Sequence, residues 1–311
     1  MPGVPPARYA YLGPQGTFTE AALRSLPAAS KAELQPHGSV GAALDAVRSG
    51  GADGAVVPIE NSIEGAVAVT LDELSSGEPL MITREIHVDV QFSLLAKRGV
   101  KPGDLRRVAT HPHAEAQCRR WLATHLPDAE VVLESSTAHA AEVVAREDSP
   151  YDGAVAAPIA ATTYRLATLA TNIADRAGAV TRFVLVSRPA TPQPRTGADK
   201  TSLVVFIRDN HPGALLEMLE QFAARGVDLT RIESRPTGSG LGEYCFSMDA
   251  VGHVDDERMG EALMGLRRMC ADVRFLGSYP RVDGEVTTVV VGTTDEDFTE
   301  AYGWLTRLRN P

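Results

Sequence analysis

The sequence is poor in cysteine and in aromatic residues. Its 311 residues include three cysteines, Cys118, Cys245 and Cys270, which are far apart and form no CxxC pair. An odd number of isolated cysteines argues against a disulfide framework and fits a reducing compartment. Aromatic residues make up 5% of the chain against 44% hydrophobic residues in all, so we expect aliphatic cores.

Positive charge is also scarce. Lysine and arginine number 30 against 40 acidic residues, which gives a net charge of -10. Nucleic acids and anionic membranes bind basic surfaces, so the composition argues against both as partners. No apolar run approaches the ~18 residues of a membrane span. The first residues show no basic segment followed by an apolar core, as a signal peptide would. We therefore expect a cytoplasmic protein.

Several motifs of nucleotide and acyl chemistry are missing. The sequence contains no GxGxxG, no GxxxxGK[ST] and no GxSxG, so dinucleotides, phosphate-cradling loops and nucleophile elbows have little support. His111 and His113 could ligate a metal, but no cysteine or aspartate set completes the site. A mononuclear zinc site needs three or four protein ligands, so we expect no metal.

The length corresponds to roughly two domains at ~150 residues each. Pro189, Pro192 and Pro194 lie close together among polar residues, which is typical of a stiff, extended connector. We place the linker at residues 189–200, between a larger N-terminal part and a smaller C-terminal part.

The N-terminal part contains an internal repeat. DGAVVPI at 53–59 is echoed by DGAVAAPI at 152–159, and we expect each to be a buried strand that ends in proline. Two further strand–loop–helix units precede each copy in the same order, at an offset of roughly 97 to 99 residues. The repeat predicts two similar α/β lobes with parallel sheets, whose ligand lies near the helix N-termini at the strand ends.

The C-terminal part has a different pattern. It predicts strands at 201–207, 227–233, 243–251 and 273–279, helices at 213–225 and 255–270, and a turn at 238–242. The order βαββαβ is the ferredoxin-like arrangement. In the tail we expect a strand at 286–291 and a capping box formed by Thr293 and Glu296, ahead of a helix through Trp304.

Polar residues at the predicted strand ends each have two readings. Thr17, Asn61 and Ser62 could bind a carboxylate or a hydroxyl, or could cap helices. Glu60 and Glu64 could form a carboxylate pair or lie solvated on the surface.

The second copy of the repeat adds Thr110 and Gln117, which lie at a strand-edge loop and on the helix that it opens. In the segment TRF, strand alternation turns Thr181 and Phe183 to one face and Arg182 to the other. Arg182 could therefore hold a carboxylate or form an ordinary ion pair.

Taken together, these motifs resemble the prephenate dehydratase family. GPQGTF, VVPIENS, HPHAEAQC, ESSTAHA, DGAVAAP and TRFVLV follow the family's order across residues 8–188, and GALL and IESRP resemble its regulatory ACT domain. The resemblance implies an α/β catalytic domain of two lobes, like type II periplasmic binding proteins, followed by a ferredoxin-like βαββαβ ACT domain. Our predicted boundaries are a catalytic domain at 1–188 (lobe 1 about 8–86 with return strand 184–188, lobe 2 about 87–183), the ACT domain at 201–279 and a tail at 280–311.

The resemblance also implies an activity. The family converts prephenate to phenylpyruvate, water and carbon dioxide in phenylalanine biosynthesis, without a metal or organic cofactor. Only a dozen residues precede GPQGTF, so we expect no fused chorismate mutase. The implied partners are prephenate, phenylalanine as feedback inhibitor, and further copies of the chain in a homodimer or homotetramer.

The predicted site follows from the same motifs. The resemblance marks Thr181 as catalytic, and many family members have serine where this chain keeps a hydroxyl at Thr110. The predicted substrate-binding residues are Thr17, Asn61, Ser62, Thr110, His111, Gln117, Ser136, Thr137, Arg182 and Phe183. The predicted phenylalanine-binding residues are Gly213, Ala214, Leu215, Leu216, Glu233, Ser234, Arg235 and Pro236.

Three other readings stay open from the sequence. An arogenate dehydratase would use the same chemistry on a substrate with an amino group in place of the keto group. A solute-binding receptor would share the two-lobed fold, and a catalytically inactive amino-acid sensor would use the ACT domain alone.

Overall fold

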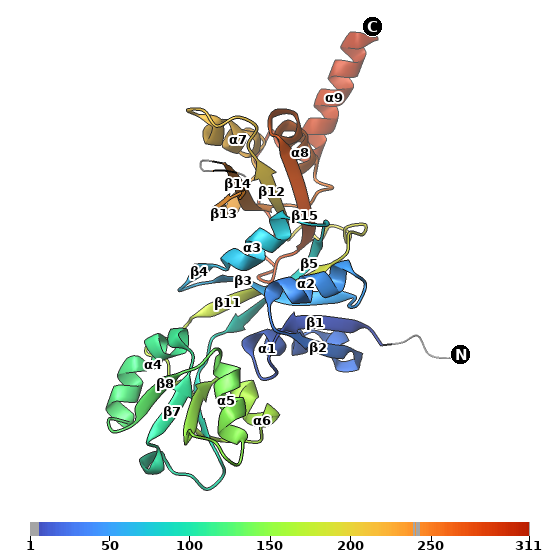
Figure 1. Cartoon of the computed structure of the whole chain (residues 1–311). Coiled ribbons are helices and arrows are strands. Elements are labelled where there is room, and N and C mark those ends of the chain that lie inside the picture. The colour runs from blue at the N-terminus through green and yellow to red at the C-terminus, as the bar shows by residue number, and fades with distance from the viewer. Residues whose placement is uncertain (1–5, 239, 241–242, 311) are drawn as a thin grey trace, which may run out of the picture. The chain divides into compact units, whose positions relative to one another are not determined.

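The computed structural model describes residues 6–238, 240 and 243–310 (Figure 1). The chain forms two compact units, which are described separately. The first holds the residues up to Val67 together with Ile86–Phe183, and the second holds Ala68–Glu85 and the residues from Val184 onward. Two of the chain's passages between the units lie within strands β5 (Met81–Asp89) and β11 (Val180–Ser187).

The first sheet contains the N-terminal copy of the repeat. Its strand order is β2-β1-β3-β11-β5, with the short strand β4 paired to β3, and β1 runs parallel to both β2 and β3. The elements of this region are β1 (Arg8–Leu12), α1 (Phe18–Arg24), the 3-10 helix η1 (Pro27–Lys31), β2 (Glu33–His37), α2 (Val40–Arg48), β3 (Gly54–Asn61), β4 (Gly65–Ala66) and α3 (Ala68–Ser75).

The second sheet contains the other copy. Its order is β10-β6-β9-β7-β8, and β7 runs parallel to both β8 and β9. The order β8-β7-β9 reproduces β2-β1-β3, so the predicted duplication is confirmed. The elements are β6 (Ser93–Ala96), η2 (Pro102–Asp104), β7 (Arg107–Thr110), α4 (Pro112–His125), β8 (Glu130–Leu133), α5 (Thr137–Ala145), β9 (Gly153–Ala156), α6 (Pro158–Thr163) and β10 (Ala167–Ala170).

The two copies differ after the repeated apolar run. β9 ends at Ala156, just before Pro158, as predicted, and Pro158 then opens α6; β3 instead continues through Pro58 to Asn61. The expectation that this strand ends in proline was therefore wrong. β1 pairs with β3 only as far as Val56, so the missing N–H of Pro58 removes no hydrogen bond to that neighbour. Because of this extension, Asn61 is the last residue of β3.

The C-terminal fold is βαββαβ, as predicted. Its antiparallel strands have the order β13-β14-β12-β15, and its two helices cover an apolar cluster that includes Leu203, Met218, Phe222 and Leu266. The elements are β12 (Asp199–Phe206), α7 (Ala214–Ala223), β13 (Leu229–Pro236), β14 (Tyr244–Val251), α8 (Glu257–Met269) and β15 (Asp272–Pro280). Within the turn expected at 238–242, residues 239, 241 and 242 lie outside the described residues.

The second unit also includes α3 and the first part of β5, which pack against the strands of the C-terminal fold. Gly277 of β15 has a φ of +128°, and a Cβ atom there would lie 2.2 Å from the carbonyl oxygen of Ile82. Lys200 Nζ donates to the buried Glu85 carboxylate at 2.8 Å. Backbone contact and a shielded ion pair therefore fix β5 to this fold.

The tail differs from its predicted form in three respects. Residues 286–291 form no strand. Their described backbone bonds run from Thr287 N to Gly197 O and from Thr293 N to Val290 O. The capping box lies one residue later than expected, between Thr294 and Asp297. Helix α9 runs from Asp295 to Arg309 rather than stopping at Trp304.

Candidate active site

A hydrogen bond between Asn61 and Thr181 joins the end of β3 to the start of β11. Asn61 Nδ2 donates to Thr181 Oγ1 at 2.8 Å. The amide oxygen of Asn61 accepts from the backbone N–H groups of Ile63 and Glu64 at 2.9 and 3.0 Å, which identifies the other end of the amide as the donor. The Thr181 hydroxyl thus accepts from Asn61 and keeps its own proton for another partner.

Ser62 holds the backbone next to Thr181. Its N–H donates to the carbonyl of Val180 at 2.9 Å, and its hydroxyl accepts from the N–H of Val180 at 2.9 Å. The hydroxyl therefore completes a two-bond clamp on the residue before Thr181. The sequence predicted Ser62 as a substrate ligand, and the structure shows it bound to the chain's own backbone.

Arg182 and Phe183 are buried, whereas Thr181 is partly exposed. The Arg182 guanidinium is buried and lies 3.6 Å from the Glu60 carboxylate. This pairing matches the alternation of the strand, which turns Arg182 away from Thr181. Phe183 is buried in the core, with 2% of its surface exposed.

The second lobe contributes Thr110 and His111 at the end of β7. Thr110 is fully buried, and its hydroxyl donates to the carbonyl of Val155 at 2.9 Å. His111 caps helix α4, because its Nδ1 accepts from the N–H of His113 at 3.2 Å. Burial and the neighbouring His113 lower the pKa of His111, so the neutral ring carries its proton on Nε2.

Gln117 lies on α4, where Asp175 forms hydrogen bonds with the backbone of the helix. The Gln117 carbonyl accepts from the N–H of Asp175 at 2.7 Å, and the Asp175 carboxylate accepts from the N–H groups of Arg120 and Trp121, each at 2.9 Å. Asp175 thereby fixes the turn that carries Gln117. Nothing in the local sequence around Asp175 signals this contact.

Thr17, Ser136 and Thr137 lie at helix N-termini. Thr17 and Ser136 are N-caps, and their hydroxyls accept from the N–H groups of Glu20 and His139 at 3.2 and 2.9 Å. Thr137 is the first residue of α5. The structure therefore confirms the helix cap expected at Thr17, and it shows that Ser136, predicted as a substrate ligand, is also a cap. Helix N-termini carry further N–H groups without a partner in the helix, and their positive ends favour anions.

Ser136 also lines a cavity of about 780 Å³ in the first unit. The sequence did not single out Gln15, His139 or Tyr164 as site residues, although they line the same cavity. The Tyr164 hydroxyl donates to the Gln15 carbonyl at 2.6 Å, which joins the GPQG loop to the end of α6. Burial raises the pKa of Tyr164 to about 12, so this hydroxyl stays a donor at neutral pH.

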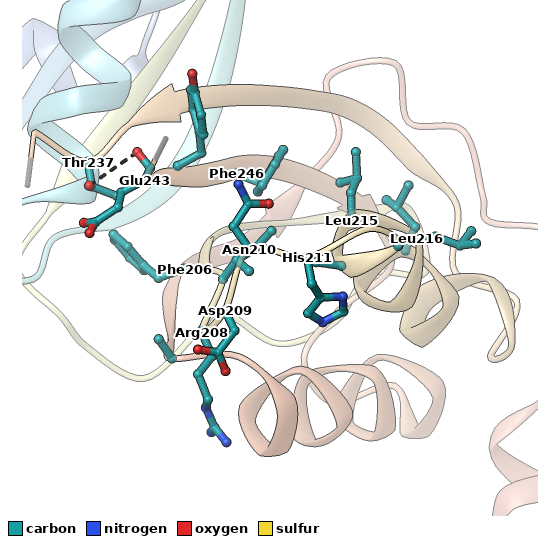
Figure 2. A pocket seen from close by; sticks show the side chains of 16 residues that line it. Phe206, Arg208, Asp209, Asn210, His211, Leu215, Leu216, Thr237, Glu243 and Phe246 are labelled. Atoms are coloured by element: carbon teal, nitrogen blue, oxygen red, sulfur yellow. Dashed lines mark hydrogen bonds between the residues drawn. The ribbon is translucent and has the colours of Figure 1, made fainter. Parts of the chain in front are cut away.

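A larger cavity of about 1070 Å³ lies in the C-terminal fold (Figure 2). Figure 2 shows Asn210 and His211 from the loop after β12 and Leu215 and Leu216 from the first turn of α7 around it. Phe206, Tyr244 and Phe246 add aromatic surface, and Arg208, Asp209 and Glu243 add both signs of charge.

The eight residues predicted to bind phenylalanine fall into two groups. Gly213, Ala214, Leu215 and Leu216 line this cavity, whereas Glu233, Ser234, Arg235 and Pro236 belong to β13 and are not part of its lining. Gly213 opens α7 with a φ of +97°, which favours glycine.

Arg235 is engaged by helix α3. Its guanidinium donates to both carboxylate oxygens of Asp72, at 2.8 and 2.7 Å. Such a two-bond pair fixes the orientation of the planar guanidinium. The pair also raises the pKa of Arg235.

The described residues contain no group of three or more side chains suited to hold a metal ion. Among them, no helix combines the length and the apolar character needed to cross a membrane. Cys118, Cys245 and Cys270 are all buried and free, and burial raises the pKa of each thiol.

Comparison with known proteins assigns the chain. The family model for prephenate dehydratase matches residues 9–191, and the model for the ACT domain matches residues 201–268. The chain belongs to the prephenate dehydratase family. The resemblance read from the motifs is thereby confirmed, and so is the fold class of a two-lobed α/β domain followed by an ACT domain.

Individual members of the prephenate dehydratase family match over nearly the whole chain. The prephenate dehydratase of Mycobacterium tuberculosis (strain ATCC 25618 / H37Rv) is 50% identical over 310 residues, which cover 97% of this chain and 94% of that protein. The structure of prephenate dehydratase from Arthrobacter aurescens in complex with L-Phe is also 50% identical, with a TM-score of 0.94 over 98% of this chain and 100% of that one. A structure described as GqqA, a quorum quenching acylase, is 32% identical, with a TM-score of 0.78 over 88% and 97%.

Proposed function

We propose that this chain converts prephenate to phenylpyruvate, with release of water and carbon dioxide. The observation that carries the proposal is the direction of the hydrogen bond between Asn61 and Thr181. Because Asn61 donates, Thr181 has an O–H group free to donate to a substrate oxygen. A leaving hydroxyl needs such a donor, since it departs more readily as water than as hydroxide.

The reaction breaks two bonds of the prephenate ring. The carbon–carbon bond to the ring carboxylate breaks, and its electron pair enters the ring as carbon dioxide leaves. The carbon–oxygen bond to the ring hydroxyl breaks at the opposite carbon, and that oxygen leaves as water after it gains a proton. The ring becomes aromatic, so the main tasks of the enzyme are to hold the reactive conformer and to assist the leaving oxygen.

Thr181 is the proposed donor to that oxygen, and Asn61 sets its direction. A threonine hydroxyl is a weak acid, and the bond accepted from Asn61 stabilises negative charge that develops on Oγ1. The clamp made by Ser62 keeps Val180, and with it Thr181, in register with Asn61.

Helix N-termini supply the proposed attraction for the substrate. Prephenate is a dianion, whereas the chain has a net charge of -10, so the protein as a whole does not attract it. Thr17, His111 and Ser136 are the N-caps of α1, α4 and α5, and the positive ends of these helices favour carboxylates. Nε2 of neutral His111 adds a hydrogen-bond donor. The proposed chemistry uses no metal or organic cofactor.

Phenylalanine is the proposed feedback inhibitor, bound in the cavity of the ACT domain. The Arthrobacter relative was solved with L-Phe. Here Leu215, Leu216 and Phe246 suit a phenyl ring, while Glu243 suits the ammonium group and the N-terminus of α7 suits the carboxylate of a free amino acid. A homo-oligomer and a cytoplasmic location complete the proposal.

Two other activities are tested beside this one. An arogenate dehydratase would show the higher kcat/KM on arogenate. An acylase would need an activated nucleophile, whereas Thr181 accepts from an amide donor, which makes its oxygen a weaker nucleophile. Purified chain is assayed for phenylpyruvate from prephenate, phenylalanine from arogenate and hydrolysis of an N-acyl amide. We expect the first to be fastest, and absence of the first overturns the proposal.

A further inference from the structure

The C-terminal tail exposes an unusual amount of apolar surface. Half of the large apolar side chains that are exposed in the described residues lie between Val282 and Leu308. Trp304 and Leu308 of α9 are 56% and 58% exposed, and Val291 before the helix is 93% exposed. Clustered exposed apolar side chains mark a surface that another molecule covers.

Helix α9 also lacks the packing that a helix of its length needs. None of its fifteen residues is buried, although isolated helices shorter than ~12–15 residues are marginal in water. Its first turn is anchored, because Asp295 accepts from Arg195 at 2.5 Å and from the N–H of Glu257 at 3.0 Å. The C-terminal half extends beyond α8, as Figure 1 shows.

The apolar side chains of this half form a helical stripe. Ala301, Trp304, Leu305 and Leu308 follow the spacing i, i+3, i+4, i+7, which places them on one face. Tyr302 lies beside the stripe and donates to Glu261 of α8, so α9 turns another side toward its own chain. The stripe itself is left for a second molecule.

The charges beside the stripe identify that molecule. Glu300 and Arg307 lie seven residues apart on the same flank, and neither has an ion-pair partner within the described part of the chain. In an antiparallel pair of identical helices, the N-terminal part of this flank on one helix lies against the C-terminal part of the same flank on the other helix. Glu300 of each copy then faces Arg307 of the other, so the surface is complementary to itself.

We propose that α9 pairs antiparallel with α9 of a second copy of this chain, about a twofold axis near Trp304. The apolar stripes form the centre of the contact, and the two Glu300–Arg307 pairs form its rim. The exposed valines at 286–291 lie directly before α9 in the chain and extend the surface available to the partner.

Charge reversal tests the pairing without any use of catalysis. The Glu300→Arg variant carries two positive charges on this flank, and the Arg307→Glu variant carries two negative charges. In a dimer of either single variant, like charges therefore face each other. Mixed one to one, the two variants regain both ion pairs, and so does the double variant Glu300→Arg/Arg307→Glu. Thr299→Arg is the control, because it adds a positive charge at an exposed position on the side of α9 opposite the stripe.

Assembly is followed by light scattering and by the emission of Trp304 in a Trp121→Phe background, where it is the only tryptophan. We expect each single reversal to raise the concentration at half-assembly about tenfold, because two like-charge contacts replace the two ion pairs at the rim. Mixing and the double variant should restore the original value, with Trp304 emission shifted to the blue on assembly.

Two results would overturn the proposal. Trp304 emission that stays typical of exposure to water at all concentrations would show that nothing covers α9. A blue shift that the charge reversals leave unchanged would show that a different surface, on a second copy or another protein, covers the helix.

Discussion

Asn61 and Thr181, 120 residues apart in the chain, lie 2.8 Å apart through Nδ2 and Oγ1, with the asparagine as donor. The turn after Asn61 fixes this direction, because two backbone N–H groups occupy the amide oxygen. A threonine that accepts from an amide has its own proton available. This relationship distinguishes a site that protonates a leaving group from one that attacks a substrate.

Asn61→Asp reverses the bond with almost no change of shape. A carboxylate only accepts, so the Thr181 proton turns toward residue 61 and away from the substrate. We expect kcat to fall by about 10²–10³-fold, within the range for loss of an acid catalyst or an oriented donor. Steady-state kinetics on prephenate measure the effect, and Asn172→Asp, at an exposed position, serves as control. A kcat within a few-fold of wild type would contradict the assigned direction.

Ser62→Ala opens one of the two bonds that hold Val180. If the hydroxyl acts on the backbone, kcat falls about tenfold, KM stays nearly constant and Ser62→Thr restores most of the rate. Hydrogen exchange of the peptide that contains Val180 should also become faster. A substrate ligand would behave differently, because its loss would raise KM and leave the exchange of Val180 unchanged.

The contacts that these two variants test, between Asn61 and Thr181 and between Ser62 and Val180, could be predicted from the sequence only in part. The duplicated strand–loop–helix units and the βαββαβ pattern were predictable because alternation and helical spacing are local properties of the chain. The motifs also identified Thr181 and Asn61 through the family resemblance. Local pattern failed at Pro58, because whether proline ends a strand depends on how far the neighbouring strand extends.

Contacts between distant residues left no trace in the sequence. Asp175 accepts a hydrogen bond from the backbone of α4 from 55 residues away, and Tyr164 donates to the Gln15 carbonyl from 149 residues away. Ser62 was recognised as polar and placed at a strand end, but its partner, Val180, depends on which strands are neighbours. A single sequence encodes such pairings only through the fold.

The Asp72–Arg235 pair predicts a route for feedback. Arg235 lies on β13 of the ACT domain, and Asp72 lies on α3, which begins two residues after β4, the partner of β3 at Asn61. Asp72→Asn removes the charge of this pair. We expect phenylalanine to inhibit the variant at a concentration about tenfold higher, while activity without phenylalanine changes less than twofold.

Inhibition curves with prephenate as substrate measure this effect. Asp45→Asn removes a carboxylate that pairs with Arg48 on α2 and is the matched control. Unchanged inhibition of the Asp72 variant would show that the ion pair carries no signal.

The depressed pKa of His111 predicts a pH-dependent loss of stability. Its folded pKa lies below the usual ~6.5, so the unfolded chain binds the proton first as the pH falls. The stabilisation is complete above about pH 6.5 and is lost as the pH falls through the lowered pKa, when protonation of Nδ1 breaks the cap on α4. His111→Asn keeps a capping acceptor at every pH.

Thermal unfolding of the two proteins between about pH 7.5 and pH 5 tests this. The melting temperature of the wild type should fall more steeply than that of His111→Asn. Parallel curves would show that His111 does not act as a titrating cap.

The role of the Thr181 hydroxyl is tested most directly by the rate of phenylpyruvate formation from prephenate by the wild type, Thr181→Ser and Thr181→Val. The valine variant keeps the shape and removes only the hydroxyl, while the serine variant keeps the hydroxyl. We predict turnover by the wild type, most of that rate in the serine variant, and a kcat at least about 10²-fold lower in a folded valine variant. A valine variant that turns over prephenate at nearly the wild-type rate would contradict the central role of the Thr181 hydroxyl.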